Sequence, residues 1–299
     1  MNRRDFVGLL PLAVALQACS SMQPKPVVAE TTGPAIVVPK PKPKLGLALG
    51  GGAARGFAHI GVIKALETSG LAPDIVVGTS VGAVVGSLYA AGFDVFDLQK
   101  IAIQLEENSL TDWSIFERGF LKGEALERFI NQQVGNRPIE QLKRRFAAVA
   151  TDLAAGEAVV FSAGNTGTAV RASASIPGVF SPVVIRGREY VDGGLVSPIP
   201  VKAARQLGAD VVIAVDISAK PSGKKNQGSI DLLLDTIAVM GHTIAEQELK
   251  DADVIIRPDM LGLPATNFQQ RNEAILQGER VGFAAIARVR EKLAAASAR

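Results

Sequence analysis

The chain contains few of the residues from which several common functional sites are built. Its 299 residues include one cysteine and two histidines, and aromatic residues make up 5%. A single cysteine excludes an intrachain disulfide, and two isolated histidines give no metal-ligand spacing. The scarcity of aromatic rings argues against a base-stacking surface, and a formal net charge of +3 is too small to indicate nucleic-acid binding. We therefore predict no metal site and no nucleic-acid partner.

No apolar run near the N-terminus is long enough to cross a bilayer as a helix. The stretch from Phe6 to Leu16 follows a positively charged start and leads to Cys19, which is typical of a secretory leader. The four residues ending at Cys19 resemble a bacterial lipoprotein lipobox, and the first residues also resemble a twin-arginine export signal. The resemblance implies a signal peptide over residues 1–18 and a lipidated Cys19.

Lipidation would anchor the protein to a membrane on the periplasmic side of a bacterial cell envelope. Ser20, in place of an acidic residue after the cysteine, favours the outer membrane over the inner one. Residues 19–44 carry six prolines among lysines and valines. Such a segment favours extended conformations and buries no core, so we expect it to be a tether.

From residue 45 onward, short apolar runs alternate with helical patterns. This alternation predicts an α/β fold over residues 45–299, a three-layer sandwich with a mainly parallel central sheet and helices on both faces. The expected strands are 45–49, 75–77, 146–151, 159–161, 183–185, 189–191, 211–215 and 254–256. The first expected helix follows the glycine-rich run and ends near residue 69. The other expected helices cover 81–91, 123–134 and 271–295. Segments 101–120 and 219–228 fit this pattern poorly, so we expect an active-site cap and a mobile loop there.

A lone serine stands between two glycines in the run Gly78-Thr79-Ser80-Val81-Gly82. The run lies between a strand pattern and a helix pattern, which is the context of a nucleophile elbow. Gly78 and Gly82 would permit the tight turn and leave room around the hydroxyl. The same residues are also compatible with an ordinary turn in which Ser80 caps the helix.

A glycine-rich run precedes this serine, after the first predicted strand. Arg55 stands where a dinucleotide-binding fingerprint needs its third glycine, and Phe57 stands where a P-loop needs lysine. Backbone N–H groups at a helix start can instead hold a developing oxyanion. Close packing of helix on strand is the structural alternative. The candidate oxyanion-hole residues are Gly50, Gly51, Gly52, Arg55 and Gly56.

The third motif is Asp192-Gly193-Gly194, which follows a predicted strand. Gly193 and Gly194 allow a carboxylate to project from a tight turn, where it could act as a general base for Ser80. An ordinary turn aspartate is the alternative. Asp152 and Asp216 also end strands, and active sites gather at the ends of parallel strands, so both remain candidates for the base.

Taken together, the three motifs resemble the patatin-like phospholipase family. The segment from Ala174 to Pro182 is similar to that family's approach to the aspartate loop, and the resemblance extends over about residues 45–215. It implies a serine hydrolase domain with a Ser80–Asp192 dyad, an oxyanion hole in the glycine loop and no metal or diffusible cofactor. The implied substrate is a phospholipid or another acyl-ester lipid, cleaved through an acyl-enzyme on Ser80.

Two alternatives to this interpretation stay open. A Ser-His-Asp triad would use His242, but an apolar stripe at Leu233, Ile237, Met240 and Ile244 would turn this histidine toward solvent. His59 shares a helix face with apolar residues and is expected to be packed. A non-enzymatic lipid-binding envelope lipoprotein would need none of the three motifs. No feature of the chain indicates an oligomeric state.

Overall fold

The computed structural model describes residues 42–108, 123–218, 228–260 and 268–299. The predicted leader, Cys19 and nearly all of the tether lie outside the described residues, as do the expected loop at 219–227 and the distal part of the expected cap. These calls on the leader and anchor stay predictions. Residues Pro41–Arg299 form one compact unit, and it is this unit that contains the candidate site.

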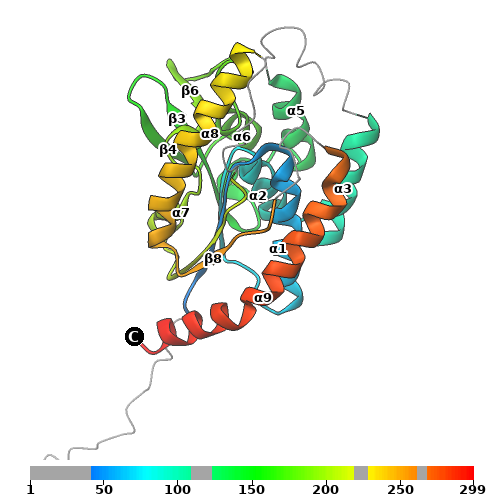
Figure 1. The fold of residues 1–299 in the computed structure, drawn as a ribbon, viewed down its shortest axis with the longest axis vertical. Coiled ribbons are helices and arrows are strands. Elements are labelled where there is room, and N and C mark those ends of the chain that lie inside the picture. Colours follow the sequence, from blue (N-terminus) through cyan, green and yellow to red (C-terminus); the bar gives the residue numbers. More distant parts are fainter. Residues whose placement is uncertain (1–41, 109–122, 219–227, 261–267) are drawn as a thin grey trace, which may run out of the picture. The chain divides into compact units, whose positions relative to one another are not determined.

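An eight-stranded sheet forms the centre of this unit (Figure 1). Its strand order is β5-β6-β3-β2-β1-β7-β8, and β4 pairs with β3. Strands β1, β2, β3, β7 and β8 run parallel, whereas β4, β5 and β6 join by antiparallel pairing. The bounds are β1 Leu45–Leu49, β2 Ile75–Thr79, β3 Arg145–Asp152, β4 Glu157–Phe161, β5 Val183–Ile185, β6 Arg188–Asp192, β7 Val211–Val215 and β8 Val254–Ile256. The predicted mainly parallel sheet is confirmed.

Helices follow most of the strands. Their bounds are α1 Phe57–Thr68, α2 Val81–Ala91, α3 Val95–Asn108, α5 Glu124–Gln133, α6 Thr166–Ser173, α7 Val201–Gln206, α8 Ser229–Glu248 and α9 Arg271–Ser297. Two short 3₁₀ turns lie at the candidate motifs: η1 Ala53–Gly56 and η3 Gly193–Leu195. Residues 101–108, the described part of the segment expected to form a cap, belong to α3.

Alternate side chains of each central strand enter different layers of the core. In β1, Leu45, Leu47 and Leu49 pack in the cluster that contains the buried residues of α1, α2 and α9. Ala48 points the other way and joins a second cluster with residues of α7 and α8. Figure 1 shows α1 and α9 on one side of the sheet and α7 and α8 on the other. Both faces of the strands are covered, which explains why their sequences are continuously apolar.

The last helix, α9, lies closely against α1. A Cβ added at Gly278 would be 2.0 Å from the carbonyl oxygen of Ala58, and one at Gly61 would be 2.0 Å from that of Ile275. This glycine seam sets the buried face of α9. Ile275, Ile286 and Val289 are buried on this face, whereas Phe283 is 47% exposed.

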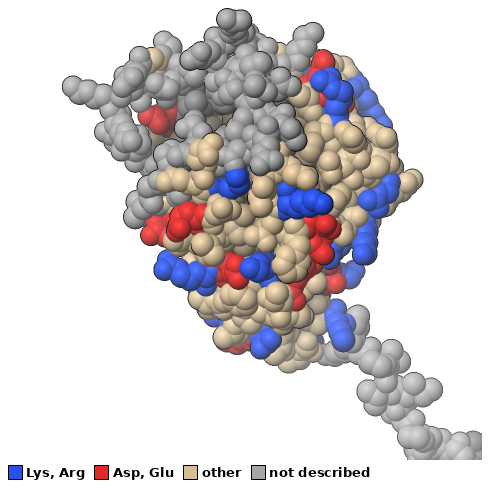
Figure 2. Space-filling model, turned by 90° about the vertical axis from the view of Figure 1, so that its right-hand side faces the viewer, with Lys and Arg blue, Asp and Glu red and all other residues tan. Residues whose placement is uncertain are grey.

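None of the helices in the described ranges combines the length and apolar composition needed to cross a bilayer. On the face turned toward the viewer in Figure 2, cationic and anionic side chains are interspersed. The small net charge is therefore not concentrated into a single-sign field on that face.

Candidate active site

The register of the sheet brings Ser80 and Asp192 to the same place. Val149 in β3 pairs with Thr79 of β2 and with Val160 of β4, so β2 and β4 lie on opposite edges of β3. Ala150 pairs with β4 and with Asp192 of β6. Strand β6 therefore continues the edge of β3 at the point where β2 ends. The residue after Thr79 and the last residue of β6 are neighbours as a consequence.

Ser80 occupies a strained turn between β2 and α2. Its φ is 55° and its ψ is −124°, a conformation that side-chain-bearing residues rarely adopt. Its N–H donates to Oγ of Ser173 at 2.9 Å, and that hydroxyl donates to the carbonyl oxygen of Val149 at 2.6 Å. Ser173, at the end of α6, thus fixes the backbone that aims the Ser80 hydroxyl. The predicted elbow conformation is present.

The two elbow glycines are required by close backbone approach. A Cβ at Gly78 would lie 2.3 Å from the carbonyl oxygen of Gly82, and a Cβ at Gly82 would lie 2.1 Å from that of Leu49. These obstacles are main-chain atoms of the sheet and of the helix start, which do not move without disturbing hydrogen bonds. The elbow therefore has no space for a methyl group at either position.

We expect Gly82→Ala to destabilise the domain by about 3 kcal/mol, since overpacking of this kind displaces backbone. Thermal unfolding followed by circular dichroism measures the effect. Gly228→Ala is the matched control, because an added methyl there meets no atom of the described residues within 4 Å and φ is −167°. A Gly82→Ala midpoint equal to that of the control would contradict the steric argument.

Asp192 ends β6 with its side chain buried. The residue is 7% exposed, its Oδ1 accepts the N–H of Gly194 at 2.7 Å, and its backbone N–H donates to the carbonyl oxygen of Ser175 at 2.9 Å. A Cβ at Gly193 would be 2.1 Å from the carbonyl oxygen of Val149, so this glycine is needed for the turn to fit against β3. The predicted aspartate loop is thus held on both sides.

Burial raises the pKa of this carboxyl above its ordinary value. Desolvation raises the pKa of Asp192 from 3.8 to about 6, while hydrogen bonding from the Ser80 hydroxyl and the Gly194 N–H pulls the pKa down in part. Oδ2 of Asp192 is enclosed and completes no hydrogen bond among the described residues. The Ser80 hydroxyl nevertheless lies close enough to lower the pKa of this carboxyl, and a catalytic hydrogen bond that is not fully aligned is common before substrate binds.

The two other candidate carboxylates are engaged elsewhere. Asp152 forms an ion pair with Arg188 at 2.8 Å and accepts the N–H groups of Ala154 and Ala155 in the β3–β4 turn. Asp216 forms an ion pair with Arg257 at 2.7 Å. Both stabilise local structure. The Asp192 carboxyl, by contrast, has the Ser80 hydroxyl as a hydrogen-bonding neighbour.

Two backbone N–H groups of the glycine loop hold the loop in place, and two others have no partner among the described residues. The N–H of Gly50 donates to Val215 and that of Gly51 donates to Pro198, at 3.1 and 3.0 Å. The N–H groups of Gly52 and Ala53 make no hydrogen bond to any described residue. Ala53 has a φ of 49°. The loop lies against the elbow, because a Cβ at Gly51 would be 3.4 Å from that of Ser80.

Two buried side chains hold the shape of this loop. Nε of Arg55 donates to the carbonyl oxygen of Gly52 at 3.2 Å. His59 is fully buried in α1, as predicted, and its Nε2–H donates to the carbonyl oxygen of Gly50 at 2.8 Å. Desolvation lowers the pKa of His59 to about 4, so the ring is neutral at pH 7. Gly56 packs on the elbow, since a Cβ there would be 2.2 Å from Val81.

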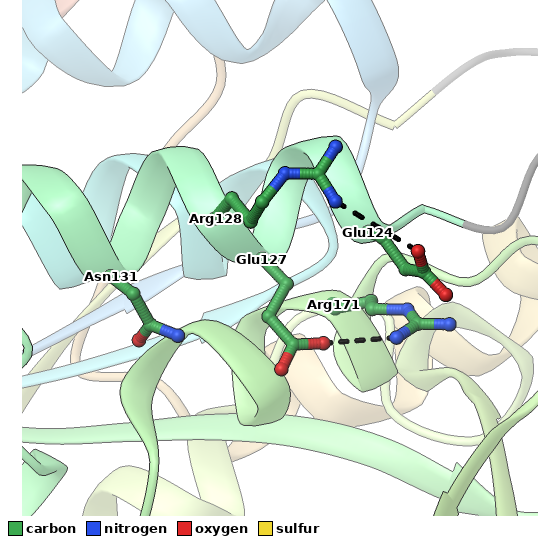
Figure 3. A pocket seen from close by; sticks show the side chains of 5 residues that line it. All are labelled: Glu124, Glu127, Arg128, Asn131 and Arg171. Carbon is green, nitrogen blue, oxygen red and sulfur yellow. Dashed lines mark hydrogen bonds and ion pairs between the residues drawn. The ribbon is translucent and has the colours of Figure 1, made fainter.

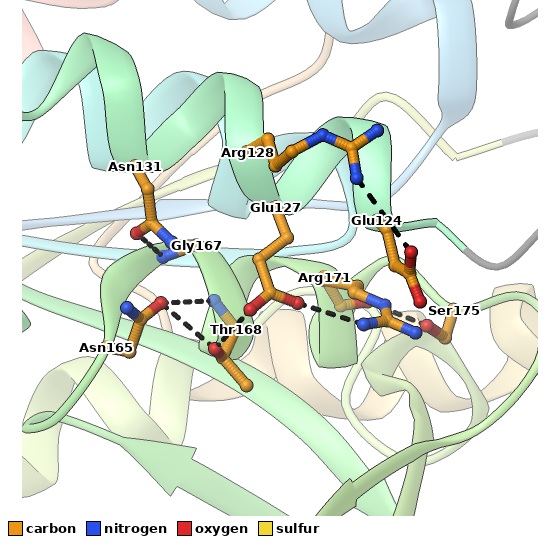
Figure 4. A network of polar contacts seen from close by, with 9 residues as sticks. All are labelled: Glu124, Glu127, Arg128, Asn131, Asn165, Gly167, Thr168, Arg171 and Ser175. Carbon is orange, nitrogen blue, oxygen red and sulfur yellow. Dashed lines mark hydrogen bonds and ion pairs between the residues drawn. The ribbon is translucent and has the colours of Figure 1, made fainter. Parts of the chain in front are cut away.

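A polar network between α5 and α6 fixes the position of α6, whose Ser173 holds the elbow. Glu127 accepts from Arg171 at 2.9 Å and from the hydroxyl of Thr168 at 2.8 Å, and Asn131 accepts the N–H of Gly167 (Figure 4). These bonds tie α6, and with it Ser173, to α5. A hollow of about 330 Å³ opens beside them (Figure 3). Its lining residues are Glu124, Glu127, Arg128, Asn131 and Arg171.

The interpretation of helix α8 needs a correction. The expected buried stripe was wrong, because Leu233 is 39% and Met240 is 53% exposed. The helix instead buries Ala245 and Glu248. A Cβ added at Gly241 would lie 3.6 Å from the carbonyl oxygen of Gly194, so the helix passes close to the aspartate loop. His242, expected to face solvent, is half-buried, and its Nδ1 is enclosed without a hydrogen-bond partner among the described residues.

Several residues that shape the site were not singled out from the sequence. They are Thr79, Ser173, Ser197 and Glu248, and His59 was predicted to be packed but not to bind the glycine loop. A hydroxyl or carboxyl in an apolar segment carries no local signal of its distant partner. The motif Asn165-Thr166-Gly167-Thr168 is the exception: it is an N-cap signal for α6, and the Asn165 side chain does accept the N–H of Thr168.

The fold and the sequence were compared with those of known proteins. The structure superimposes on the crystal structure of VipD from Legionella pneumophila with a TM-score of 0.54 and 13% identity, covering 82% of this chain and 66% of that chain. This likeness shows the mixed α/β fold with a central sheet flanked by helices. The family model for patatin-like phospholipase matches residues 47–205. The chain belongs to the patatin-like phospholipase family.

Curated relatives agree with this assignment. An uncharacterized NTE family protein of Mycobacterium tuberculosis is 43% identical over 183 residues, which are 60% of this chain and 51% of that protein. Lysophospholipase NTE1 of Coccidioides immitis is 37% identical over 181 residues, 58% of this chain and 12% of that protein. The chain thus spans about half the length of the mycobacterial relative and a small part of the fungal one.

Proposed function

We propose that this chain is a lipid acyl hydrolase that uses Ser80 as nucleophile and Asp192 as general base. The proposal rests above all on one observation: a hydroxyl on a strained elbow lies beside a buried carboxyl of raised pKa, next to a loop in which two N–H groups have no partner among the described residues. Family membership and the lysophospholipase name of a relative support a lipid ester as substrate.

In the proposed reaction, Oγ of Ser80 attacks the ester carbonyl carbon while its proton passes to Oδ2 of Asp192. The oxyanion formed accepts hydrogen bonds from the N–H groups of Gly52 and Ala53. Collapse breaks the carbon–oxygen bond, and Asp192 returns the proton to the departing alkoxide, which leaves as an alcohol. The acyl group then remains esterified to Ser80.

Water completes the cycle. Asp192 takes a proton from the water molecule as it attacks the acyl carbon, and the same two N–H groups hold the second oxyanion. Ser80 is released when the proton is returned to its Oγ, and the product is a fatty acid. Phospholipids and lysophospholipids are the proposed substrates.

A fluorophosphonate probe tests the nucleophile directly, because it forms a covalent bond only with an activated serine. We expect the purified wild-type domain to be labelled and Ser80→Ala to remain unlabelled. Mass spectrometry of the peptide that contains Ser80 locates the adduct. Absence of labelling in a folded wild type would sink the proposal and favour a lipid-binding protein without activity.

His242 supplies a control for the dyad, since a Ser-His-Asp triad would depend on it. The Nδ1 atom of its half-buried ring has no hydrogen-bond partner among the described residues, so we expect His242→Ala to label at a rate within about twofold of wild type. A folded His242→Ala variant that fails to label would replace the dyad by a triad.

A further inference from the structure

The segment Ser197–Ile199 joins the three parts of the candidate site. The hydroxyl of Thr79, which precedes the nucleophile, donates to the carbonyl oxygen of Ser197 at 2.8 Å. The N–H of Gly51 donates to the carbonyl oxygen of Pro198 at 3.0 Å. The N–H of Ser197 donates to the carbonyl oxygen of Gly193 at 2.8 Å. The elbow, the glycine loop and the aspartate loop thus all contact one short segment.

A buried carboxylate from another element holds this segment. Glu248, the last residue of α8, is 6% exposed. Its Oε1 accepts the hydroxyl of Ser197 at 2.5 Å and its Oε2 accepts the N–H of Ile199 at 2.8 Å. The two bonds flank Pro198, whose carbonyl oxygen holds the glycine loop. Burial of an acid with two directed donors restricts the segment to one position.

We propose that Glu248 is a positioning residue of the active site, which acts through Ser197–Ile199 to hold the glycine loop and the nucleophile elbow in register. The inference rests on the proposed function. Glu248 itself does not touch the reacting atoms, because its contacts are with Ser197 and Ile199. Helix α8 lies with α7 on the side of the sheet opposite α1 and α9 (Figure 1), so its end supports the site from outside the three motifs.

The charge state of Glu248 gives this role a measurable signature. Desolvation raises its pKa from 4.5 to about 7, opposed by the bonds from Ser197 and Ile199 and by the charge of Lys202 in α7; Asp251 raises it further. Above pH 7 the ionised carboxylate accepts both bonds. Protonation removes one acceptor site, so the support weakens as the pH falls through 7.

The sign for stability is opposite to that for activity. Because the folded-state pKa lies above the ordinary value, ionisation of Glu248 costs stability as the pH rises from about 4.5 to 7. Glu248→Gln removes this cost and keeps one acceptor oxygen. We therefore expect Glu248→Gln to unfold at a temperature close to that of wild type at pH 8, so that a loss of activity cannot be attributed to unfolding.

The test compares Glu248→Gln, Glu248→Leu and Ser197→Ala with wild type in hydrolysis of a soluble p-nitrophenyl ester at pH 8. Glu246→Gln is the matched control: the same exchange two residues earlier in α8, at a side chain that is 48% exposed and pairs with Arg257. We expect kcat to fall about 10-fold in Glu248→Gln and about 100-fold in Glu248→Leu, with KM within twofold. Ser197→Ala should resemble Glu248→Gln.

The pH profile separates positioning from simple structural support. In wild type the acidic limb of kcat/KM should contain an ionisation near 7 in addition to that of Asp192 near 6, and Glu248→Gln should retain only the lower one. An active wild type whose variants match Glu246→Gln in kcat and pH profile overturns this inference alone. A wild type with neither turnover nor fluorophosphonate labelling overturns the proposed function and this inference with it.

Discussion

Ser80→Ala is expected to reduce kcat for a p-nitrophenyl ester by about 10⁴-fold or more, which is the scale of losing a catalytic nucleophile. The reason is local. Oγ is the atom that would bond to the acyl carbon, and no other described hydroxyl has both the elbow conformation and Asp192 as neighbour. In Ser80→Ala, a water molecule in the position of Oγ would be assisted only by the N–H groups of the loop, which stabilise the oxyanion.

The fold should be unaffected by this change. The contacts that set the elbow are made by the backbone N–H of Ser80 and by Ser173, and alanine keeps the first of these. Initial rates and a thermal melt on the same preparation separate chemistry from folding. Ser173→Ala is a useful comparison, because it leaves Oγ of Ser80 in place and removes only its anchor. Substantial turnover by a folded Ser80→Ala variant would end the assignment of the nucleophile.

Asp192→Asn is expected to lower kcat by about 10³-fold, because an amide cannot take the proton from Ser80. Asparagine is nearly isosteric, and its carbonyl oxygen can still accept the N–H of Gly194, so the turn should be retained. In wild type, kcat/KM should rise with pH through about 6, as Asp192 ionises. Glu248→Gln isolates this ionisation from the higher one.

The same substitution has an opposite effect on stability. The folded-state pKa of Asp192 lies above its ordinary value of 3.8, so ionisation costs stability as the pH rises from about 4 to 6. At pH 8, Asp192→Asn should unfold at the same temperature as wild type or a higher one, and the difference should vanish below pH 4. A variant that is inactive and also less stable at pH 8 would indicate a structural aspartate.

The strands and the elbow could be predicted because their signals are local. Residues Leu45–Leu49 form a five-residue apolar run, and β1 has these bounds. Helix α2 covers Val81–Ala91 as expected, since it begins directly after Ser80 and ends at Gly92, whose φ is 108°. Helix α3 was also within reach of such reasoning: Asp94 accepts the N–H groups of Phe96 and Asp97, which is an N-cap pattern.

The buried face of helix α8 could not be predicted from the sequence, because the residues that it buries are not its most hydrophobic ones. Gly241 and Ala245 face the aspartate loop and the core, while Leu233 and Met240 are exposed. Small residues are placed there by close approach of the backbones, which a sequence pattern does not reveal. The bonds of Glu248 are equally hidden, since Ser197 and Ile199 lie in the loop before α7, about fifty residues earlier in the chain.

The continuation of β2 by β6 along one edge of β3 has a consequence for the newly made chain. Strands β2 and β3, which lie beside the serine turn, are made first, whereas the hairpin that carries Asp192 is made later. Until that hairpin docks, the Ser80 hydroxyl has no Asp192 carboxylate beside it to accept its proton. Under the proposed function, a chain whose hairpin has not yet docked would lack its general base and would not hydrolyse lipids.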